Sequence, residues 1–247
     1  MVSAAGQASR RDAGDACAVL GVRRMTYDNI VRAVFLDRPN RFVAHVELGG
    51  AVETVHVKNT GRCRELLLPG AEVWLTASRN PSRKTGYDLV AVRKASGTLF
   101  NIDSQAPNRV VSEWLETQAF DRILPEYTFG GSRIDFCMER GSVRCLMEVK
   151  GCTLEVDGVG YFPDAPTERG VKHLRELMRA REAGYRAILA FVIQMDGVTE
   201  VRANAGTHPE FASVLEEAVD AGVRVLCLPC HAEPDRLDIL PGIEVRI

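Results

Sequence analysis

The spacing of apolar residues changes near residue 100, and this change constrains the fold more than any other feature of the chain. Before it, apolar and polar residues alternate in short runs such as residues 42–48 and 52–57, which is the pattern of half-buried β-strands. Gly49 and Gly50 between these runs are typical of a hairpin turn. Beyond residue 106, helical spacing alternates with apolar runs, which predicts strands joined by helices. The sequence therefore predicts a small β domain followed by an α/β domain.

The first pattern predicts strands at residues 42–48, 52–57, 72–77 and 87–93. Several short strands in about 55 residues are typical of a small barrel of the OB type, although any small antiparallel β domain gives the same periodicity. We expect this OB-like β domain to span residues 26–100. Residues 1–25 are rich in Ala, Gly, Ser and Arg and lack the apolar core of a secretory signal, so we expect a disordered tail there.

The second pattern predicts an α/β domain over residues 101–247. Amphipathic helices are expected at residues 107–120, 167–183 and 209–221. Strands are expected at residues 134–139, 143–150, 187–195 and 223–228. Thr167 is suited to cap the second helix and Gly184 to end it. The alternation of strands and helices implies right-handed crossovers on a mixed sheet.

Charge is unevenly distributed along the chain. The formal net charge of −2 excludes only a protein that is basic throughout. Residues 1–100 carry 15 Lys and Arg against 9 Asp and Glu, and most of this excess lies between Lys58 and Lys94. A concentrated basic segment is compatible with a nucleic-acid partner, and the acidic remainder is compatible with a bound metal.

Seven scattered cysteines are typical of a reducing compartment, so we expect a cytoplasmic protein. Cys227 and Cys230 form the one close pair, and we interpret them as structural thiols, with a metal or redox site as the alternative. The longest apolar run, residues 187–193, is far shorter than a membrane-spanning helix requires, so no membrane partner is expected.

Two carboxylates and a lysine form the candidate catalytic site. Asp135 and Glu148 lie in otherwise apolar strand runs, where a carboxylate is costly to bury unless a cation neutralises it. Glu148 and Lys150 share one face of their strand, and a neighbouring strand would bring Asp135 beside them. Such a site suits Mg²⁺ or Mn²⁺, with Lys150 orienting or deprotonating a water for attack on phosphorus. The spacing alone favours an interpretation of these residues as solvated strand charges. Their apolar context favours a metal site instead. The order of the predicted elements, which is that of a PD-(D/E)XK nuclease core, also favours a metal site.

The helix predicted at residues 167–183 places basic residues beside this site: Arg169, Lys172 and His173. We expect them to hold nucleic-acid phosphates, with a solvated helix face as the alternative. His173 alone is interpreted as a polar-face residue, not as a catalytic base. Glu113 on the preceding helix is a candidate third metal ligand.

The β domain carries the candidate nucleic-acid-binding residues Lys58, Asn59, Thr60, Arg62, Arg64, Arg83 and Lys84. On an OB-like barrel, strands and loops form a groove that follows a nucleic-acid backbone. Only Trp74 and Tyr87 are available for base stacking, which favours backbone contacts and weak sequence specificity. A solvated cluster of loop charges is the alternative.

Five motifs, in this order, resemble the sugar fermentation stimulation protein family: HVKNTGR at residues 56–62, Arg83-Lys84, SRIDF at 132–136, EVK at 148–150 and FPDAPTERGVKHL at 162–174. The likeness runs from about residue 41 to residue 228. It implies an OB-like N-terminal domain, a PD-(D/E)XK nuclease-like α/β domain, DNA binding and a regulatory link to sugar utilisation. It also carries the acidic triad onto Asp135, Glu148 and Lys150.

We therefore expect a DNA-binding protein of weak sequence specificity whose nuclease-like domain is a Mg²⁺-dependent or Mn²⁺-dependent phosphodiesterase. A non-catalytic DNA-binding regulator of sugar metabolism is the first alternative, and an enzyme of sugar metabolism is the second. The absence of a Gly-rich phosphate loop and of a nucleophile elbow disfavours the sugar enzyme. RNA as the partner and a homodimer remain open.

Overall fold

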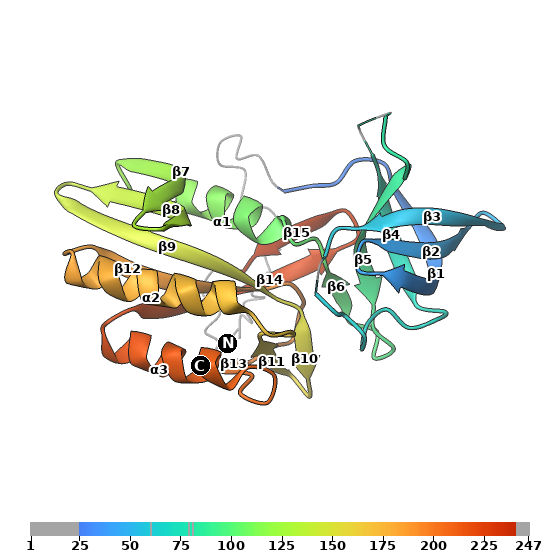
Figure 1. Ribbon diagram of the computed structural model, residues 1–247. Coiled ribbons are helices and arrows are strands. Elements are labelled where there is room, and N and C mark those ends of the chain that lie inside the picture. Colours follow the sequence, from blue (N-terminus) through green and yellow to red (C-terminus); the bar gives the residue numbers. More distant parts are fainter. Residues whose placement is uncertain (1–24, 60, 79, 81, 241–247) are drawn as a thin grey trace, which may run out of the picture.

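The computed structural model describes residues 25–240 except residues 60, 79 and 81. Two halves lie side by side, a β-barrel and a larger α/β half (Figure 1). The expected tail over residues 1–25, apart from Met25, and the candidate residue Thr60 lie outside the described residues.

The first half confirms the expected OB-like barrel. Its strands are β1 (Ile30–Asn40), β2 (Val43–Leu48), β3 (Ala51–Val57), β4 (Glu72–Ala77), β5 (Tyr87–Arg93) and β6 (Leu99–Asn101). They run in the order β3-β2-β1-β4-β5-β6, and a parallel pairing of β3 with β5 closes the barrel. Alternate residues such as Phe35, Val46 and Leu75 point inward and are almost fully buried. Strand β1 was not predicted from the sequence, because register shifts after Phe35 interrupt the alternation of buried and exposed residues.

The second half confirms the expected α/β domain with a mixed sheet. Its main sheet has the order β15-β14-β12-β9-β8-β7. The strands are β7 (Arg122–Phe129), β8 (Ser132–Arg140), β9 (Val143–Cys152), β12 (Arg186–Ile193), β14 (Arg224–Glu233) and β15 (Arg236–Ile239). Strands β9, β12 and β14 are parallel to one another, whereas β7, β8 and β15 pair antiparallel. A smaller sheet contains β10 (Leu154–Val156), β11 (Val159–Phe162) and β13 (Glu200–Ala203).

Three helices cover the main sheet, with α1 on one face and α2 and α3 on the other (Figure 1). They are α1 (Ala106–Glu116), α2 (Glu168–Glu182) and α3 (Pro209–Asp220). Helix α2 begins as predicted, because the Thr167 hydroxyl accepts a hydrogen bond of 3.0 Å from the Gly170 amide. It ends before Gly184, whose φ of 87° favours glycine. No helix among the described residues is long and apolar enough to cross a membrane.

The cysteine pair does not form a joint site. Cys227 and Cys230 are free thiols on β14. Because they are three residues apart on a strand, they face opposite sides of the sheet. Cys227 packs against the core under α2 and α3, and Cys230 lies in the core under α1. This arrangement supports structural thiols and not a dithiol or a metal site.

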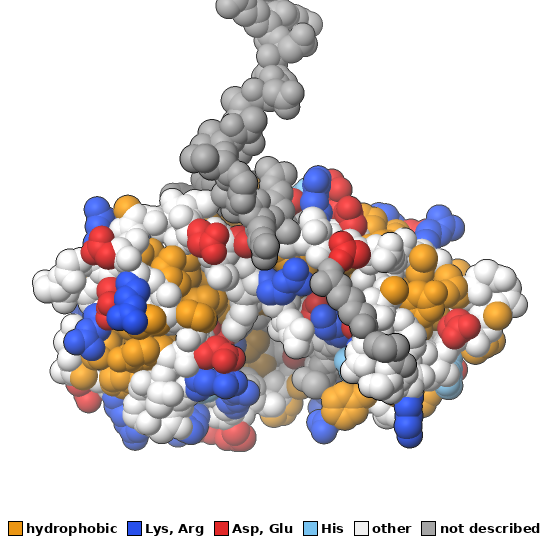
Figure 2. Space-filling view, turned by 90° about the horizontal axis from the view of Figure 1, so that it is seen from above, with side chains coloured by type: hydrophobic (Ala, Val, Ile, Leu, Met, Phe, Trp, Pro, Cys, Tyr) orange, Lys and Arg blue, Asp and Glu red, His pale blue; other side chains and the backbone are white. Residues whose placement is uncertain are grey.

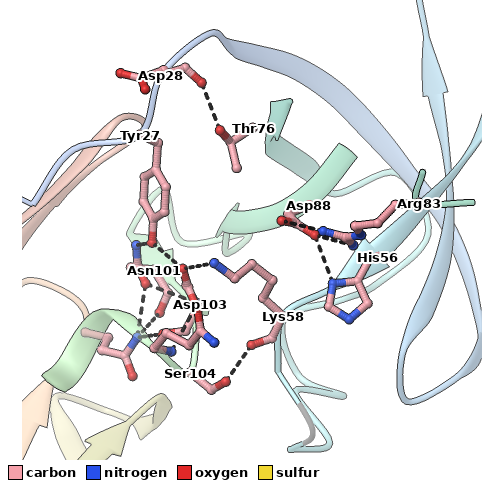
Figure 3. Close-up of polar contacts among 12 residues, drawn as sticks. Tyr27, Asp28, His56, Lys58, Thr76, Arg83, Asp88, Asn101, Asp103 and Ser104 are labelled. Atoms are coloured by element: carbon pink, nitrogen blue, oxygen red, sulfur yellow. Dashed lines mark hydrogen bonds and ion pairs between the residues drawn. The ribbon is translucent and has the colours of Figure 1, made fainter. Parts of the chain in front are cut away.

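A buried polar network joins the two halves (Figure 3). Asp103, fully buried between β6 and α1, accepts hydrogen bonds from Lys58 Nζ at 2.8 Å and from the Tyr27 hydroxyl at 3.1 Å. The Gln194 amide donates to the carbonyl oxygens of Asn101 and Asp103 at 3.1 Å each. The barrel is therefore fixed to the α/β half by satisfied polar groups as well as by apolar contacts.

Candidate active site

Asp135 and Glu148 are brought together by neighbouring antiparallel strands. The register of β8 and β9 pairs Phe136 with Met147, the residues next to Asp135 and Glu148. Glu148 contacts His173 of α2, whereas Asp135 contacts Asn108 of α1. The charge of Glu148 nevertheless acts on the Asp135 carboxyl, so the two acids lie close together.

Asp135 is held by two donors. Its Oδ1 accepts from the Asn108 side-chain amide at 2.7 Å, and its Oδ2 accepts from the Val149 backbone amide at 2.8 Å. Burial and the nearby charge of Glu148 raise the pKa of the Asp135 carboxyl, and the two hydrogen bonds offset only part of this rise. A cation bound here, in addition to Lys150, would relieve the repulsion between the Asp135 and Glu148 carboxylates.

Glu148 is 2% exposed and uses only one of its two oxygens. Its Oε1 contacts Lys150 Nζ at 2.5 Å and also contacts His173 Nδ1. Burial raises the pKa of Glu148, but His173 and Lys150 outweigh burial, so the pKa lies below its ordinary value. Its Oε2 is buried and has no hydrogen-bond partner among the described residues. An ionised carboxylate with an unsatisfied buried oxygen is suited to receive a cation.

His173 differs from its sequence interpretation as a polar-face residue. It is 4% exposed, and its Nε2 accepts from Arg169 Nε at 3.4 Å while its Nδ1 faces Glu148. Helical spacing contained the signal, because His173 follows Gly170 by three residues and precedes Leu177 by four, on the buried stripe of α2. Lys172 lies off this stripe, and its Nζ donates to the Gly131 carbonyl at 2.7 Å.

The structure does not bring Glu113 to the site as a third ligand. It lies five residues after Asn108, which places it about 140° around the helix from Asn108. The Glu113 carboxyl accepts a hydrogen bond from the Met25 backbone and lies near Asp238. Burial is the main cause that raises the pKa of Glu113. Asn108 contacts Asp135 instead, and no spacing in the sequence singled Asn108 out.

The residues present fit a divalent metal such as Mg²⁺ or Mn²⁺. Hard cations prefer carboxylate oxygens, and Asp135 and Glu148 supply two acidic side chains on adjacent strands. The mutual repulsion that raises the pKa of Asp135 and the unsatisfied Oε2 of Glu148 are both relieved by such a cation. Lys150, with a side chain that is 14% exposed, borders this pair.

A second group of candidate ligands lies at the start of α2 and α3 and comprises Glu168, His208 and Glu210. His208 Nδ1 accepts a hydrogen bond from the Thr167 amide at 3.2 Å. A neutral imidazole that accepts at Nδ1 carries its proton on Nε2, the atom that faces Glu168 at 3.6 Å. Glu210 is paired with Arg175 at 2.8 Å. These residues therefore stabilise the helix starts and are less suited than Asp135 and Glu148 to hold a metal.

The segment formed by Lys58, Asn59, Gly61 and Arg62 is fixed between the two halves. Arg38, which sequence reasoning missed, donates from its guanidinium to the carbonyls of Asn59, Gly61 and Arg62 at 2.7, 3.0 and 2.8 Å. The Arg62 amide donates to Asp164 Oδ2 at 3.0 Å. A Cβ on Gly61 would lie 2.4 Å from this Asp164 oxygen, so any other side chain here would displace Asp164.

This segment lies beside the starts of α1 and α2. It contacts Ser104 just before α1, since the Ser104 amide donates to the Lys58 carbonyl at 2.9 Å, and it contacts Asp164 just before α2. The same helix starts supply Asn108, Arg169 and His173 to the site. The two halves thus contribute to one continuous region.

The basic candidates of the barrel differ in whether their side chains form ion pairs. Lys58 pairs with Asp103, and Arg83 pairs with Asp88 at 2.8 Å (Figure 3). Hydrogen bonds from Arg83 and His56 outweigh burial and lower the pKa of Asp88. Exposed residues without an ion pair to another described residue are Arg62, Arg64 and Lys84.

Comparisons with known proteins match both halves. A model of the sugar fermentation stimulation protein RE domain matches residues 105–236, and a model of the SfsA N-terminal OB domain matches residues 36–102. The chain belongs to the sugar fermentation stimulation protein family. A homologue of this family from Desulfitobacterium hafniense (strain Y51) is 49% identical over 90% of this chain and 99% of the relative. One from Ruminiclostridium cellulolyticum is 46% identical over 90% of this chain and 100% of the relative.

A solved structure of this sugar fermentation stimulation protein family supports the same fold. The structure of Pyrococcus furiosus SfsA in complex with Ca²⁺ has a TM-score of 0.80 and 26% identity to this chain. The likeness covers 91% of this chain and 99% of the Pyrococcus chain. The family resemblance inferred from the five motifs is therefore confirmed.

The longest of the five motifs, residues 162–174, contains residues that pack or position the region around the carboxylates. Phe162 packs its ring against Phe191 and Phe211, with ring centroids 5.4 and 5.1 Å apart. Asp164 fixes the barrel segment, and Thr167 caps α2. Each part of the motif thus packs or positions the region around the carboxylates.

Proposed function

We propose that this protein binds DNA with weak sequence specificity and cleaves phosphodiester bonds with a divalent metal held by Asp135 and Glu148. The observation that carries the proposal is the buried Oε2 of Glu148, which has no partner among the described residues and lies near the carboxyl of Asp135. The Ca²⁺ complex of the Pyrococcus relative is consistent with a cation site in this family. A bound Mg²⁺ or Mn²⁺ would neutralise charge on the scissile phosphate and lower the pKa of an attacking water.

The residues of the chain have distinct roles in this proposal. Lys150 Nζ, 2.5 Å from Glu148 Oε1, orients the attacking water and stabilises the negative charge that develops on the phosphate. His173 is a positioning residue, because its Nδ1 contact fixes Oε1 of Glu148 and leaves Oε2 for the cation. Asn108 and the Val149 amide orient Asp135 in the same way.

DNA would lie along the region shared by the two halves. Asn59 and Arg62 border it from the barrel, and Arg169 borders it from α2. On the face shown in Figure 2, basic side chains are mixed with acidic ones and form no broad basic surface. Because few basic side chains border the shared region, we expect contacts to a few backbone phosphates, with affinity that falls as salt rises from about 50 to 200 mM.

Cleavage assays test the catalytic part of the proposal. We expect purified protein to cleave single-stranded or double-stranded DNA or RNA in Mg²⁺ or Mn²⁺ and to be inactive in EDTA. Asp135→Asn and Lys150→Ala should each lower the rate by about 100-fold or more. Glu113→Gln is the matched control and should leave the rate unchanged. Cleavage that survives both substitutions would show that another site or another protein is responsible.

Retardation assays separate binding from catalysis. If Lys150→Ala binds DNA as wild type does but does not cleave it, both parts of the proposal hold. Salt-dependent binding without cleavage of any substrate would instead favour the non-catalytic DNA-binding regulator. No complex at about 50 mM salt would contradict the proposed phosphate contacts.

A further inference from the structure

A cavity at the far end of the α/β half contains positive charge that the proposed function does not use. Its volume is about 700 Å³. It lies at the turn between β8 and β9 and at the first residues of β12 and β14, the end of the main sheet that points away from the barrel (Figure 1). The proposed metal ligands lie further along the strands, and Glu148 faces the opposite side of β9 from Cys145 in the cavity.

Four arginines and no acidic side chain line this cavity. They are Arg140, Arg181, Arg186 and Arg224. All four are exposed, and none of them forms an ion pair with another described residue. Clustered positive charges repel one another, and a bound anion would relieve this repulsion.

Two of these arginines lie on neighbouring strands. Arg186 lies opposite Cys145 in the register of β12 and β9, and Arg224 lies opposite Ile188 in the register of β14 and β12. Burial raises the pKa of the Cys145 thiol to about 11, while the charges of Arg186, Arg181 and Arg224 act in the opposite direction. Three arginines that line the cavity therefore act electrostatically on one buried thiol of the same lining.

The other lining residues indicate which chemical group the ligand carries next to its phosphate. Apart from the arginines the lining consists of Gly222 and six apolar side chains: Phe120, Met138, Val143, Cys145, Ala187 and Ile188. No Asp, Glu, Asn, Gln, Ser or Thr is among the lining residues. A flat base packs against apolar side chains and stacks on guanidinium planes. The volume is in the range of pockets that bind small organic ligands.

We propose that this arginine-lined cavity is a second site, separate from the carboxylate site, that binds the phosphates and base of a nucleotide. Arginine suits this ligand because its planar fork binds phosphate through paired hydrogen bonds. The shared chemistry is a phosphate ester next to a base. It is supplied either by a free nucleotide or by the 5′-phosphorylated end of a nucleic acid.

Calorimetric titration in EDTA with adenosine 5′-diphosphate tests the proposal without involving the metal. We expect wild type to bind it with a dissociation constant below about 1 mM, and to bind inorganic phosphate and adenosine more weakly. Arg186→Gln/Arg224→Gln should weaken binding by about 10-fold or more, and Arg140→Gln should weaken it independently. Arg93→Gln/Arg175→Gln removes the same charge elsewhere and should change affinity by less than about twofold.

Competition then distinguishes the two sources. Displacement of adenosine 5′-diphosphate by a 5′-phosphorylated oligonucleotide but not by its 5′-hydroxyl counterpart would support a nucleic-acid end. Displacement by neither would support a free nucleotide. Equal displacement by both would place the nucleotide on a general backbone-binding surface and overturn the proposal. Equal affinity of wild type and Arg186→Gln/Arg224→Gln would overturn it as well, and thermal unfolding would check that the variants fold.

Discussion

At the scale of single residues, the site contains two carboxylates whose pKa values are shifted in opposite directions. Glu148 stays ionised because Lys150 and His173 outweigh its burial, whereas burial and the charge of Glu148 raise the pKa of Asp135. The apolar surroundings of both acids were readable in the sequence and predicted this pairing. The contacts of Asn108 and Arg38 were not, because they depend on how distant elements meet.

Replacement of Asp135 by asparagine should stabilise the metal-free protein at neutral pH. A raised pKa in the folded state means that the ionised form lowers stability, an effect that appears as pH rises through the folded pKa. The asparagine side chain has no such charge, and its carbonyl oxygen can still accept from the Val149 amide. We expect a higher thermal midpoint than wild type in EDTA near pH 7, and a smaller gain near pH 4. The exposed control Asp37→Asn should show no such gain, and a lower midpoint for Asp135→Asn at pH 7 would contradict the account.

At the scale of elements, sequence patterns predicted those strands and helices whose burial is periodic. Helix α2 and strands β2 to β5 were predicted to within a few residues. Strand β7 was not, since it contains Pro125 and a positive φ of 53° at Glu126, and both interrupt a regular pattern. The helices α1 and α3 end earlier than their apolar spacing suggests, at Glu116 and Asp220.

Replacement of Gly61 by alanine should disturb the segment between the barrel and α2. Its Cβ would lie 2.4 Å from Asp164 Oδ2 and 2.8 Å from Asn59 Oδ1, so the bond from the Arg62 amide to Asp164 would be lost. We expect a loss of about 1–3 kcal/mol in the free energy of unfolding and weaker DNA binding. Gly86→Ala is the control, because a Cβ there meets no atom within 4 Å. Equal free energies of unfolding for Gly61→Ala and Gly86→Ala would show that the segment accommodates the added Cβ without loss of stability and would contradict this prediction.

At the scale of the whole molecule, the buried Asp103 couples the barrel to the α/β half. Its removal leaves the half-buried Lys58 Nζ and the buried Tyr27 hydroxyl without this acceptor. Asp103→Ala should therefore lower the free energy of unfolding by about 3–5 kcal/mol. In a double-mutant cycle, Lys58→Met together with Asp103→Ala should cost less than the sum of the single changes. Strictly additive costs in urea unfolding would contradict a direct coupling.

The central claim is that Asp135 and Glu148 together bind one divalent cation, and calorimetric titration of Mn²⁺ tests it most directly. We predict one site per chain in wild type, and affinity weakened by about 10-fold or more in Asp135→Asn and in Glu148→Gln. Glu113→Gln and Glu210→Gln should bind Mn²⁺ as wild type does, since those carboxylates lie elsewhere. Absence of binding in wild type, or undiminished binding in Asp135→Asn and Glu148→Gln, would contradict the account.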